Sequence, residues 1–123
     1  MKLIDYKSKE TSVAPLHYEC FAQEIAGKSL DFGNMAINYV EMPKEGYADP
    51  HYHPHSEHIY LVLEGEMIVN NGKEVITVSA GQAAYVEKGE PHKVTSNGRD
   101  AIKYFIITVP PGEFIPAEGD FNC

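Results

Sequence analysis

Most apolar positions of this chain fall into short segments rich in Val, Ile, Tyr and Phe, with turn residues between them. Few windows show the i, i+3, i+4, i+7 spacing of an amphipathic helix, and segments of this length and composition are typical of strands. The predicted strands are residues 16–25, 31–42, 58–63, 66–70, 74–78, 83–87, 92–96 and 101–109. Eight short strands joined by turns predict an all-β fold, an antiparallel sandwich or a small barrel.

Turn signals support this interpretation. Asn71-Gly72 predicts a hairpin with a type I′ turn, in which both central residues need a positive φ.

The two ends of the chain differ from the middle. Residues 1–14 are polar, and we expect them to be ordered only by docking on another surface. The tail, residues 110–123, is expected to be a surface strap or a loose end, with Phe114, Ile115 and Phe121 covered by the barrel or by a partner subunit.

Composition narrows the function classes. The formal charge of −8 argues against a nucleic-acid or anionic-membrane surface, which would need a basic patch. The N-terminus has no apolar run of a signal peptide, and no stretch approaches the roughly 20 apolar residues of a membrane span. Cys20 and Cys123 form no disulfide framework. We therefore expect a cytoplasmic protein that binds neither nucleic acid nor membrane.

Histidines carry the candidate chemistry, and the stretch PHYHPHSEH holds four of the six. His51 and His53 are two apart, and alternate residues of a strand share a face, so both imidazoles can point into one interior. After a turn, the next strand can bring His58 or Glu57 back opposite this pair. His92 opens a later strand and can approach from across the barrel. Three or four imidazoles within apolar walls suit Mn, Fe, Co, Ni, Cu or Zn.

With these histidines the chain resembles the cupins, specifically the small single-domain kind with a conserved barrel (cupin type 2). The first cupin motif runs Gly, five residues, His-x-His, three or four residues, Glu, six residues, Gly. This sequence has Gly46, His51, His53 and Gly65 in that order, with a first gap of four residues instead of five.

The second cupin motif is also present. It runs Gly, five residues, Pro-x-Gly, two residues, His, three residues, Asn. Gly81, Gly89 and His92 match it, whereas Glu87 stands at the proline position and Ser96 at the asparagine position. Two spaced motifs together are far more specific than an isolated His-x-His pair.

The resemblance implies a jelly-roll antiparallel β-barrel, also called a double-stranded β-helix. It implies one cupin domain over residues 1–123, with an N-terminal strand region at 1–29, the conserved barrel at about 30–110 and the tail at 110–123. It implies one divalent transition metal, with Mn or Fe favoured by the likeness to four-histidine cupins and Ni, Zn, Co or Cu as alternatives. It also implies a homodimer, formed through the outer sheet and exchanged N-terminal strands.

The fourth ligand has two candidates. Three residues separate His53 from Glu57, and six residues separate His58 from Gly65. We favour His58, because a one-residue slip in the strand that leads to Gly65 would turn every side chain to the other face, whereas the preceding turn can absorb a length change. Four neutral imidazoles would leave the site at the full +2 charge of the metal, and one glutamate would reduce it to +1.

Other residues near the motifs have weaker assignments. Tyr60 lies two positions after His58 on the same face, where it can bind substrate, act as a general base or simply form part of the wall. Some cupin lyases carry a catalytic tyrosine at this offset. Met42, Phe105 and Ile107 are candidates for the wall of a substrate pocket.

The two remaining histidines are not expected to bind the metal. His55 lies in the turn and is expected to be solvated or to lie behind the ligands, and His17 is expected to be an ordinary strand residue.

Two classes of function remain open. The first is a metal-dependent enzyme acting on a small anionic or carbonyl-bearing molecule, either an oxygenase or a lyase or isomerase that uses Tyr60. The second is a non-catalytic protein that binds a small ligand or a metal. A general base beside the metal would separate the two, and the fold alone fixes no reaction.

Overall fold

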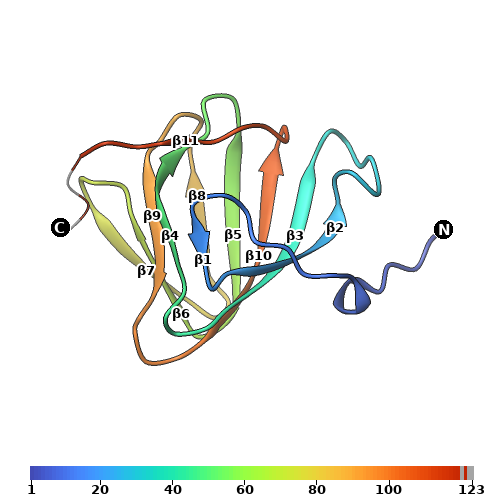
Figure 1. The fold of residues 1–123 in the computed structure, drawn as a ribbon, viewed down its shortest axis with the longest axis horizontal. Coiled ribbons are helices and arrows are strands. Elements are labelled where there is room, and N and C mark those ends of the chain that lie inside the picture. The colour runs from blue at the N-terminus through green and yellow to red at the C-terminus, as the bar shows by residue number, and fades with distance from the viewer. Residues whose placement is uncertain (120, 122–123) are drawn as a thin grey trace.

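The computed structural model describes residues 1–119 and 121, so Cys123 lies outside the described residues. Two antiparallel sheets face each other and enclose the core (Figure 1). One sheet has the order β2 (Phe21–Ala26), β3 (Ala36–Met42), β10 (Ile102–Val109), β5 (Glu57–Glu64) and β8 (Ala83–Val86). The other has the order β1 (His17–Tyr18), β4 (Tyr47–Tyr52), β9 (His92–Ser96), β6 (Glu66–Asn70) and β7 (Val75–Ser79), and β11 (Ile115–Pro116) also pairs with β4. The arrangement confirms the predicted all-β, jelly-roll fold.

The strand boundaries correct the sequence-based expectation in three places. The expected strand at 16–25 is two strands, because the chain turns at Glu19, which has a φ of 49°. The strand expected from residue 31 begins at Ala36. Strand β4 was absent from the predicted strands because Asp49 and Pro50, both unfavourable in strands, occupy its middle.

The hairpin between β6 and β7 is present, but its turn is not type I′. Gly72 has a φ of 87°, whereas Asn71 does not have a positive φ. The Asn71 side chain instead accepts hydrogen bonds from the backbone N–H groups of Lys73 and Glu74, at 2.9 and 2.8 Å. This side-chain capping stabilises a longer loop, which explains why the dipeptide predicted the hairpin but not its geometry.

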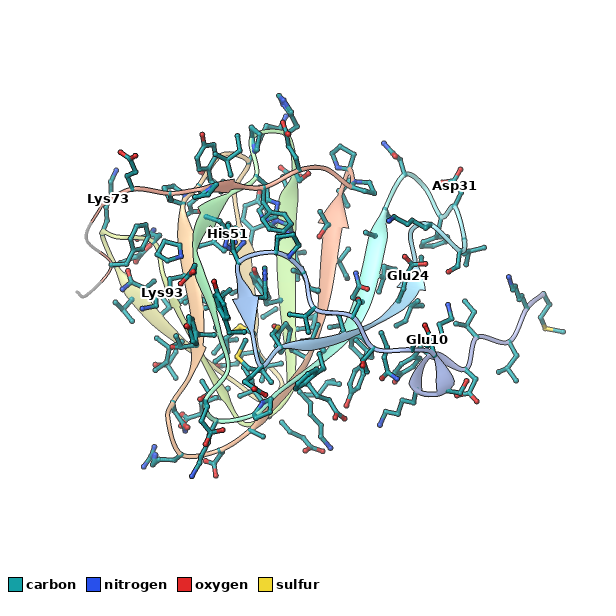
Figure 2. The ribbon with its side chains drawn as sticks, viewed as in Figure 1. Glu10, Glu24, Asp31, His51, Lys73 and Lys93 are labelled. Atoms are coloured by element: carbon teal, nitrogen blue, oxygen red, sulfur yellow. The ribbon has the colours of Figure 1, made fainter. Side chains whose placement is uncertain are left out.

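The core lies between the two sheets. Met67 and Ile102 are 0% exposed, and Val94 is 2% exposed. Full burial of each such side chain contributes about 1.5–3 kcal/mol to stability. Exposed charged side chains such as Asp31 and Lys73 lie at the periphery, whereas His51 lies between the sheets (Figure 2).

Steric crowding explains why glycine occupies two positions of the first motif. A Cβ atom at Gly46 would lie 2.3 Å from the carbonyl oxygen of Glu19. Gly65 has a φ of 80°, and a Cβ atom there would lie 2.5 Å from the carbonyl oxygen of Ala101. Any larger residue would push apart segments that fix where β4 begins and where β5 ends, and these strands carry His51 and His58, discussed below.

Both ends of the chain pack against the sheets. A short 3-10 helix, Tyr6–Ser8, places the Tyr6 ring 5.3 Å from Tyr39 and 5.8 Å from Phe105, between ring centroids, on the outer face of the β2–β3–β10 side. At the other end, the segment after β10 crosses one end of the barrel through β11 (Figure 1). Phe121 is buried, and its carbonyl oxygen accepts a hydrogen bond from the side-chain amide of Asn70. No helix within the described ranges is long and apolar enough to cross a membrane.

Candidate metal centre

Four histidines meet in the interior of the barrel. His51 lies on β4, His53 follows the end of that strand, His58 lies on β5 and His92 is the first residue of β9. Their side chains are buried, with 7% exposure at most. Both sheets therefore contribute to the cluster. Contrary to the expectation, His92 does not approach from across the barrel, because β9 pairs with β4 in the same sheet, and it is His58 that comes from the opposite sheet.

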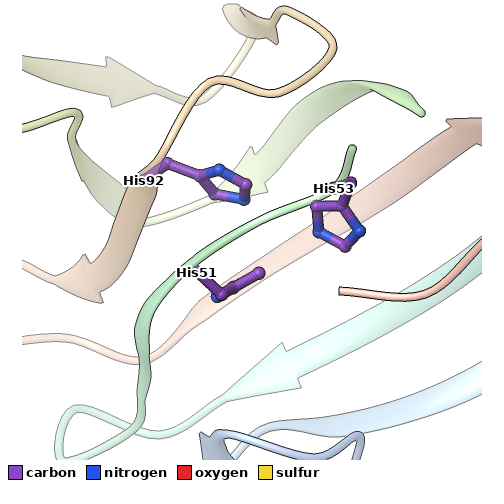
Figure 3. A group of neighbouring side chains, drawn as sticks. All are labelled: His51, His53 and His92. Atoms are coloured by element: carbon purple, nitrogen blue, oxygen red, sulfur yellow. The ribbon is translucent and has the colours of Figure 1, made fainter. Parts of the chain in front are cut away.

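Three of the four lie closest to one another. His51 and His92 are register partners in the β4–β9 pair. His53 is two residues further along on the same side, so one ring nitrogen from each of the three residues lies within 4.8 Å of the other two (Figure 3). Imidazole nitrogens at this mutual distance can ligate one metal ion.

His58 joins this group from the opposite sheet. Its ring centroid lies 3.9 Å from that of His53 and 5.8 Å from that of His92. The alternation of β5 sends the neighbouring Glu57 outward, where it is exposed and accepts a hydrogen bond of 2.9 Å from the hydroxyl of Tyr85. The strand register thus puts His58, and not Glu57, beside the other imidazoles.

Hydrogen bonds orient three of the rings through the nitrogen that faces away from the cluster. Nδ1 of His51 and of His92 donates to the carbonyl oxygens of Asp49 and Glu90, at 2.6 and 2.9 Å. Nδ1 of His58 lies 2.8 Å from the hydroxyl oxygen of Thr108. Because a carbonyl can only accept, each of the first two rings carries its hydrogen on Nδ1 and leaves Nε2 as a bare lone pair.

The nitrogens that face inward have no protein partner. Within the described part of the chain, Nε2 of His58 and His92 and both ring nitrogens of His53 are buried without a hydrogen bond. Leaving such a group unsatisfied costs about 1–3 kcal/mol. A divalent transition metal would satisfy these nitrogens, so the residues present fit such an ion.

Burial also sets the charge of the cluster. Desolvation, and then the repulsion of neighbouring histidines, lowers the pKa of His51 to about 4 and that of His58 to about 3. The same causes lower the pKa of His53, and burial lowers that of His92. All four rings are therefore neutral near pH 7, which is the form that binds metal.

A cavity of about 260 Å³ adjoins the cluster and is lined by residues of both sheets and of the segment after β10. On β10 the lining residues are Tyr104, Ile106 and Thr108. These three alternate with Phe105 and Ile107, which belong to the opposite face of the strand.

The predicted pocket wall is therefore wrong for this cavity, since Met42, Phe105 and Ile107 are not among the described residues that line it. Phe105 packs outside, against Tyr6 and Tyr39. Met42 is 1% exposed and belongs to the core cluster. The sequence could not show the correct face, because both faces of β10 are mostly apolar.

Tyr60 lines the cavity next to the histidines. Its ring centroid lies 6.2 Å from that of His58 and 6.3 Å from that of His92. Burial raises the pKa of its hydroxyl well above the ordinary value, so in the metal-free protein Tyr60 keeps its hydrogen at neutral pH.

Three further residues, which the sequence did not indicate, belong to the site. His17, expected to be an ordinary strand residue, lines the cavity with its ring centroid 5.2 Å from that of His51, and burial lowers its pKa. Phe114 lines the cavity as well, with its ring 5.3 Å from the rings of both His51 and His53. Cys20 Sγ lies 3.5 Å from the hydroxyl oxygen of Tyr104.

The sequence did not indicate His17 and Phe114 because strand pairing, and not a local pattern, places them in the site. Pairing of β1 and of β11 with β4 brings His17 and Phe114 to the cluster, and no local pattern announces such short strands. His55, in contrast, is exposed and is not among the described lining residues, in line with its place in the turn.

Comparisons with known proteins agree with this architecture. A family model described as a cupin domain matches residues 38–109. The tetracenomycin polyketide synthase protein TcmJ of Streptomyces glaucescens is 23% identical over 90 residues, which are 72% of this chain and 60% of that protein. The uncharacterized protein YdbB of Bacillus subtilis is 35% identical over 79 residues, which are 61% of this chain and 70% of that protein. The aligned part thus spans about three-fifths of the length of the first relative.

Solved structures show the same fold. The polyketide cyclase RemF of Streptomyces resistomycificus superposes with a TM-score of 0.84 at 18% identity, over 98% of this chain and 87% of that one. A predicted oxalate decarboxylase of Thermotoga maritima superposes with a TM-score of 0.78 at 14% identity, over 89% of this chain and all of that one. The family match covers more than half of the chain and includes the four interior histidines, and it shows that this chain belongs to the cupin family.

Proposed function

We propose that this protein is a metal-dependent enzyme that converts a small organic molecule inside the barrel. His51, His53, His58 and His92 are the proposed ligands. The observation that carries the proposal is the set of buried ring nitrogens that lack a protein partner beside a cavity. Histidines that only stabilised the fold would bond these nitrogens to other protein groups.

The chain itself fixes the ligand geometry. The carbonyl groups of Asp49 and Glu90 and the hydroxyl of Thr108 hold the Nδ1 atoms, so three Nε2 atoms are aimed inward, and those of His51 and His92 are lone pairs. A bound manganese or iron ion would supply a Lewis acid and an electron donor to dioxygen, and Ni, Zn, Co or Cu suits the same nitrogen ligands.

The cavity wall favours a reaction of the oxygenase type. Among the described residues that line it, none is Asp, Glu, Lys or Arg. In the metal-free protein burial raises the pKa of Tyr60, so its hydroxyl can donate a hydrogen bond at neutral pH. With no carboxylate, amine or guanidinium group among these residues, the proposed chemistry depends on the metal and its open positions, where a carbonyl or anionic group of the substrate would bind.

A second candidate is a metal-assisted cyclisation, isomerisation or lyase reaction that consumes no dioxygen. The likeness to a polyketide cyclase and to a polyketide synthase protein favours it. Here Tyr60 would act as a proton donor to the bound molecule, since its hydroxyl keeps its hydrogen at neutral pH. Plain binding of a small ligand is the non-catalytic alternative.

Elemental analysis of protein purified without added metal or chelator tests the proposal first. About one equivalent of manganese or iron per chain, followed by substrate-dependent oxygen uptake, would support the oxygenase. Conversion of a small molecule without oxygen uptake would support the second candidate. A protein that contains no metal and also refuses added manganese, iron and zinc would contradict both. Metal binding without turnover of any tested molecule would favour the binding protein.

A further inference from the structure

His17 adds a fifth imidazole to the cavity, outside the proposed ligand set. It opens β1, which pairs with β4 through His17 and Ala48. Its ring packs 5.2 Å from that of His51 and 5.8 Å from that of Phe114. The ring is therefore held in place at the wall of the cavity, next to the metal ligands but on a different strand.

The hydrogen bonding of His17 defines what its free nitrogen can do. Nδ1 lies 2.8 Å from the carbonyl oxygen of Pro15, which can only accept, so Nδ1 carries the hydrogen. In the neutral ring this leaves Nε2 as a lone pair that can accept one hydrogen bond. The described part of the chain offers Nε2 no such donor. A molecule in the cavity that meets this atom must bring the donor itself.

The rest of the wall restricts that molecule further. The described lining residues include no charged side chain, so a second ionic group away from the metal would lose its hydration without a partner. The lining includes small side chains, the alanines at positions 14, 22, 36 and 48, together with the rings of Tyr60, Tyr104 and Phe114. Aromatic walls of this kind suit a flat ring, which packs against them edge to face or offset.

Resting on the proposed function, we propose that the bound molecule carries a phenol or enol whose uncharged hydroxyl group donates a hydrogen bond to Nε2 of His17. A hydroxyl is the donor that adds the least polar surface to a largely apolar cavity. An amide would bring both a donor and a carbonyl that need partners. His17 is then a specificity-determining residue, and the other oxygen atoms of the molecule face the metal ligands.

Binding measurements with two matched naphthalenes test this assignment. Isothermal titration compares 2-naphthol, which has the hydroxyl, with 2-methoxynaphthalene, which lacks the donor, on zinc-loaded and on metal-free protein. We expect 2-naphthol to bind about two- to tenfold more tightly in both forms, the value of one uncharged hydrogen bond. His17→Phe should abolish the difference, and His17→Gln should keep part of it because the amide oxygen also accepts. His55→Phe, at the exposed turn, is the matched control and should behave as wild type.

Each alternative result has a distinct meaning. An unchanged preference in His17→Phe, or a preference present only with zinc, would overturn the assignment, because the metal would then be recognising the hydroxyl. Failure of both naphthalenes to bind would overturn the uncharged ring as the substrate class. If the preference depends on His17 but the protein takes up no metal, the substrate class stands and the metal-dependent function fails.

Discussion

The two faces of β5 differ in composition and in role. On the inner face, His58 and Tyr60 are 2% and 3% exposed, and on the outer face Ile59 and Leu61 are 39% and 38% exposed. At these positions the strand buries a histidine and a tyrosine, beside Val62, and exposes aliphatic residues. That inversion is costly on both sides, since buried imidazoles lose hydration and exposed leucines meet water.

The difference teaches where to look for function. A barrel that needed only stability would place the aliphatic residues inside. Here the inner imidazoles have lone pairs without protein partners, which a metal would satisfy, and the outer aliphatic residues belong to a surface that a partner would cover. The predictions below separate these two explanations, and they run from the largest expected effect on the site to the smallest.

Removing one inner ligand should have the largest effect. We expect His58→Ala or His92→Ala to weaken metal binding more than about 100-fold, because the affinity of an imidazole site depends on its ligand count. Glu57→Ala, one residue away on the outer face, should leave metal affinity unchanged. Competition with a chromophoric chelator measures both. The reverse ranking of His58 and Glu57 would show that the ligand register is wrong.

His55→Ala provides a further control for that experiment. This histidine belongs to the same short stretch of sequence as the proposed ligands but is exposed in the turn. Its removal should leave the metal content of the purified protein unchanged. A loss of metal in this variant would give the turn a role that its exposure does not suggest.

Much of this comparison was predictable from the sequence, and part of it was not. The strand-rich pattern and the two motifs predicted the fold, and the Gly65 spacing favoured His58 over Glu57, whose outward position agrees with it. The pocket wall was not predictable, because β10 is mostly apolar on both faces and alternation alone does not say which face is inside. The roles of His17 and Phe114 depend on pairings of two-residue strands, which long-range packing decides.

Acid should destabilise the metal-free protein through the inner face. The pKa of His51 falls to about 4 on folding, from about 6.5 in an unfolded chain. Between these values the unfolded chain binds more protons, so the free energy of unfolding decreases as the pH falls, by about 1.4 kcal/mol per pH unit for this histidine. Urea titrations between about pH 6.5 and pH 5, above the range of most carboxylates, should show this slope.

The same titrations on His51→Leu provide the control. This variant should show a shallower decrease with falling pH, because it lacks one histidine that gains a proton on unfolding. Leu61→Val, on the outer face, should keep the wild-type slope. A wild-type curve that is flat over this pH range would mean that the interior histidines take up protons as readily in the folded protein as in the unfolded chain, so that burial does not lower their pKa values.

Thr108 should have a smaller effect, because it acts through His58. Its hydroxyl lies 2.8 Å from Nδ1 and is the one side-chain anchor among the three Nδ1 contacts described above. We expect Thr108→Val to weaken metal binding about tenfold, at the lower end for residues behind a metal ligand, and Thr108→Ser to restore most of it. Thr95→Val, the same chemical change on β9 away from the cavity lining, should have no effect.

The spectrum of a cobalt-loaded protein gives a second measurement of the Thr108 contact. Freeing the His58 ring should alter the visible absorption of the cobalt site, which a loss of overall stability alone would not do. Equal metal affinities and equal spectra for wild type and Thr108→Val would mean that packing, and not this hydrogen bond, orients His58.

The outer face should matter least to the site and most to assembly. Ile59, Leu61 and Leu63 form a row of exposed aliphatic residues along β5, and Tyr85 on the neighbouring β8 is 55% exposed. We propose that a second copy of the chain covers this row, so the wild-type protein should sediment as a homodimer. Leu61→Lys should shift it to the monomer while leaving metal content unchanged, because a lysine in the centre of an apolar interface would be buried without a partner.

Ile76→Lys, on the exposed side of the other sheet, is the matched control and should remain dimeric. A wild-type protein that sediments as a monomer at all concentrations would rule out this interface, and the exposed aliphatic face of β5 would then need another partner.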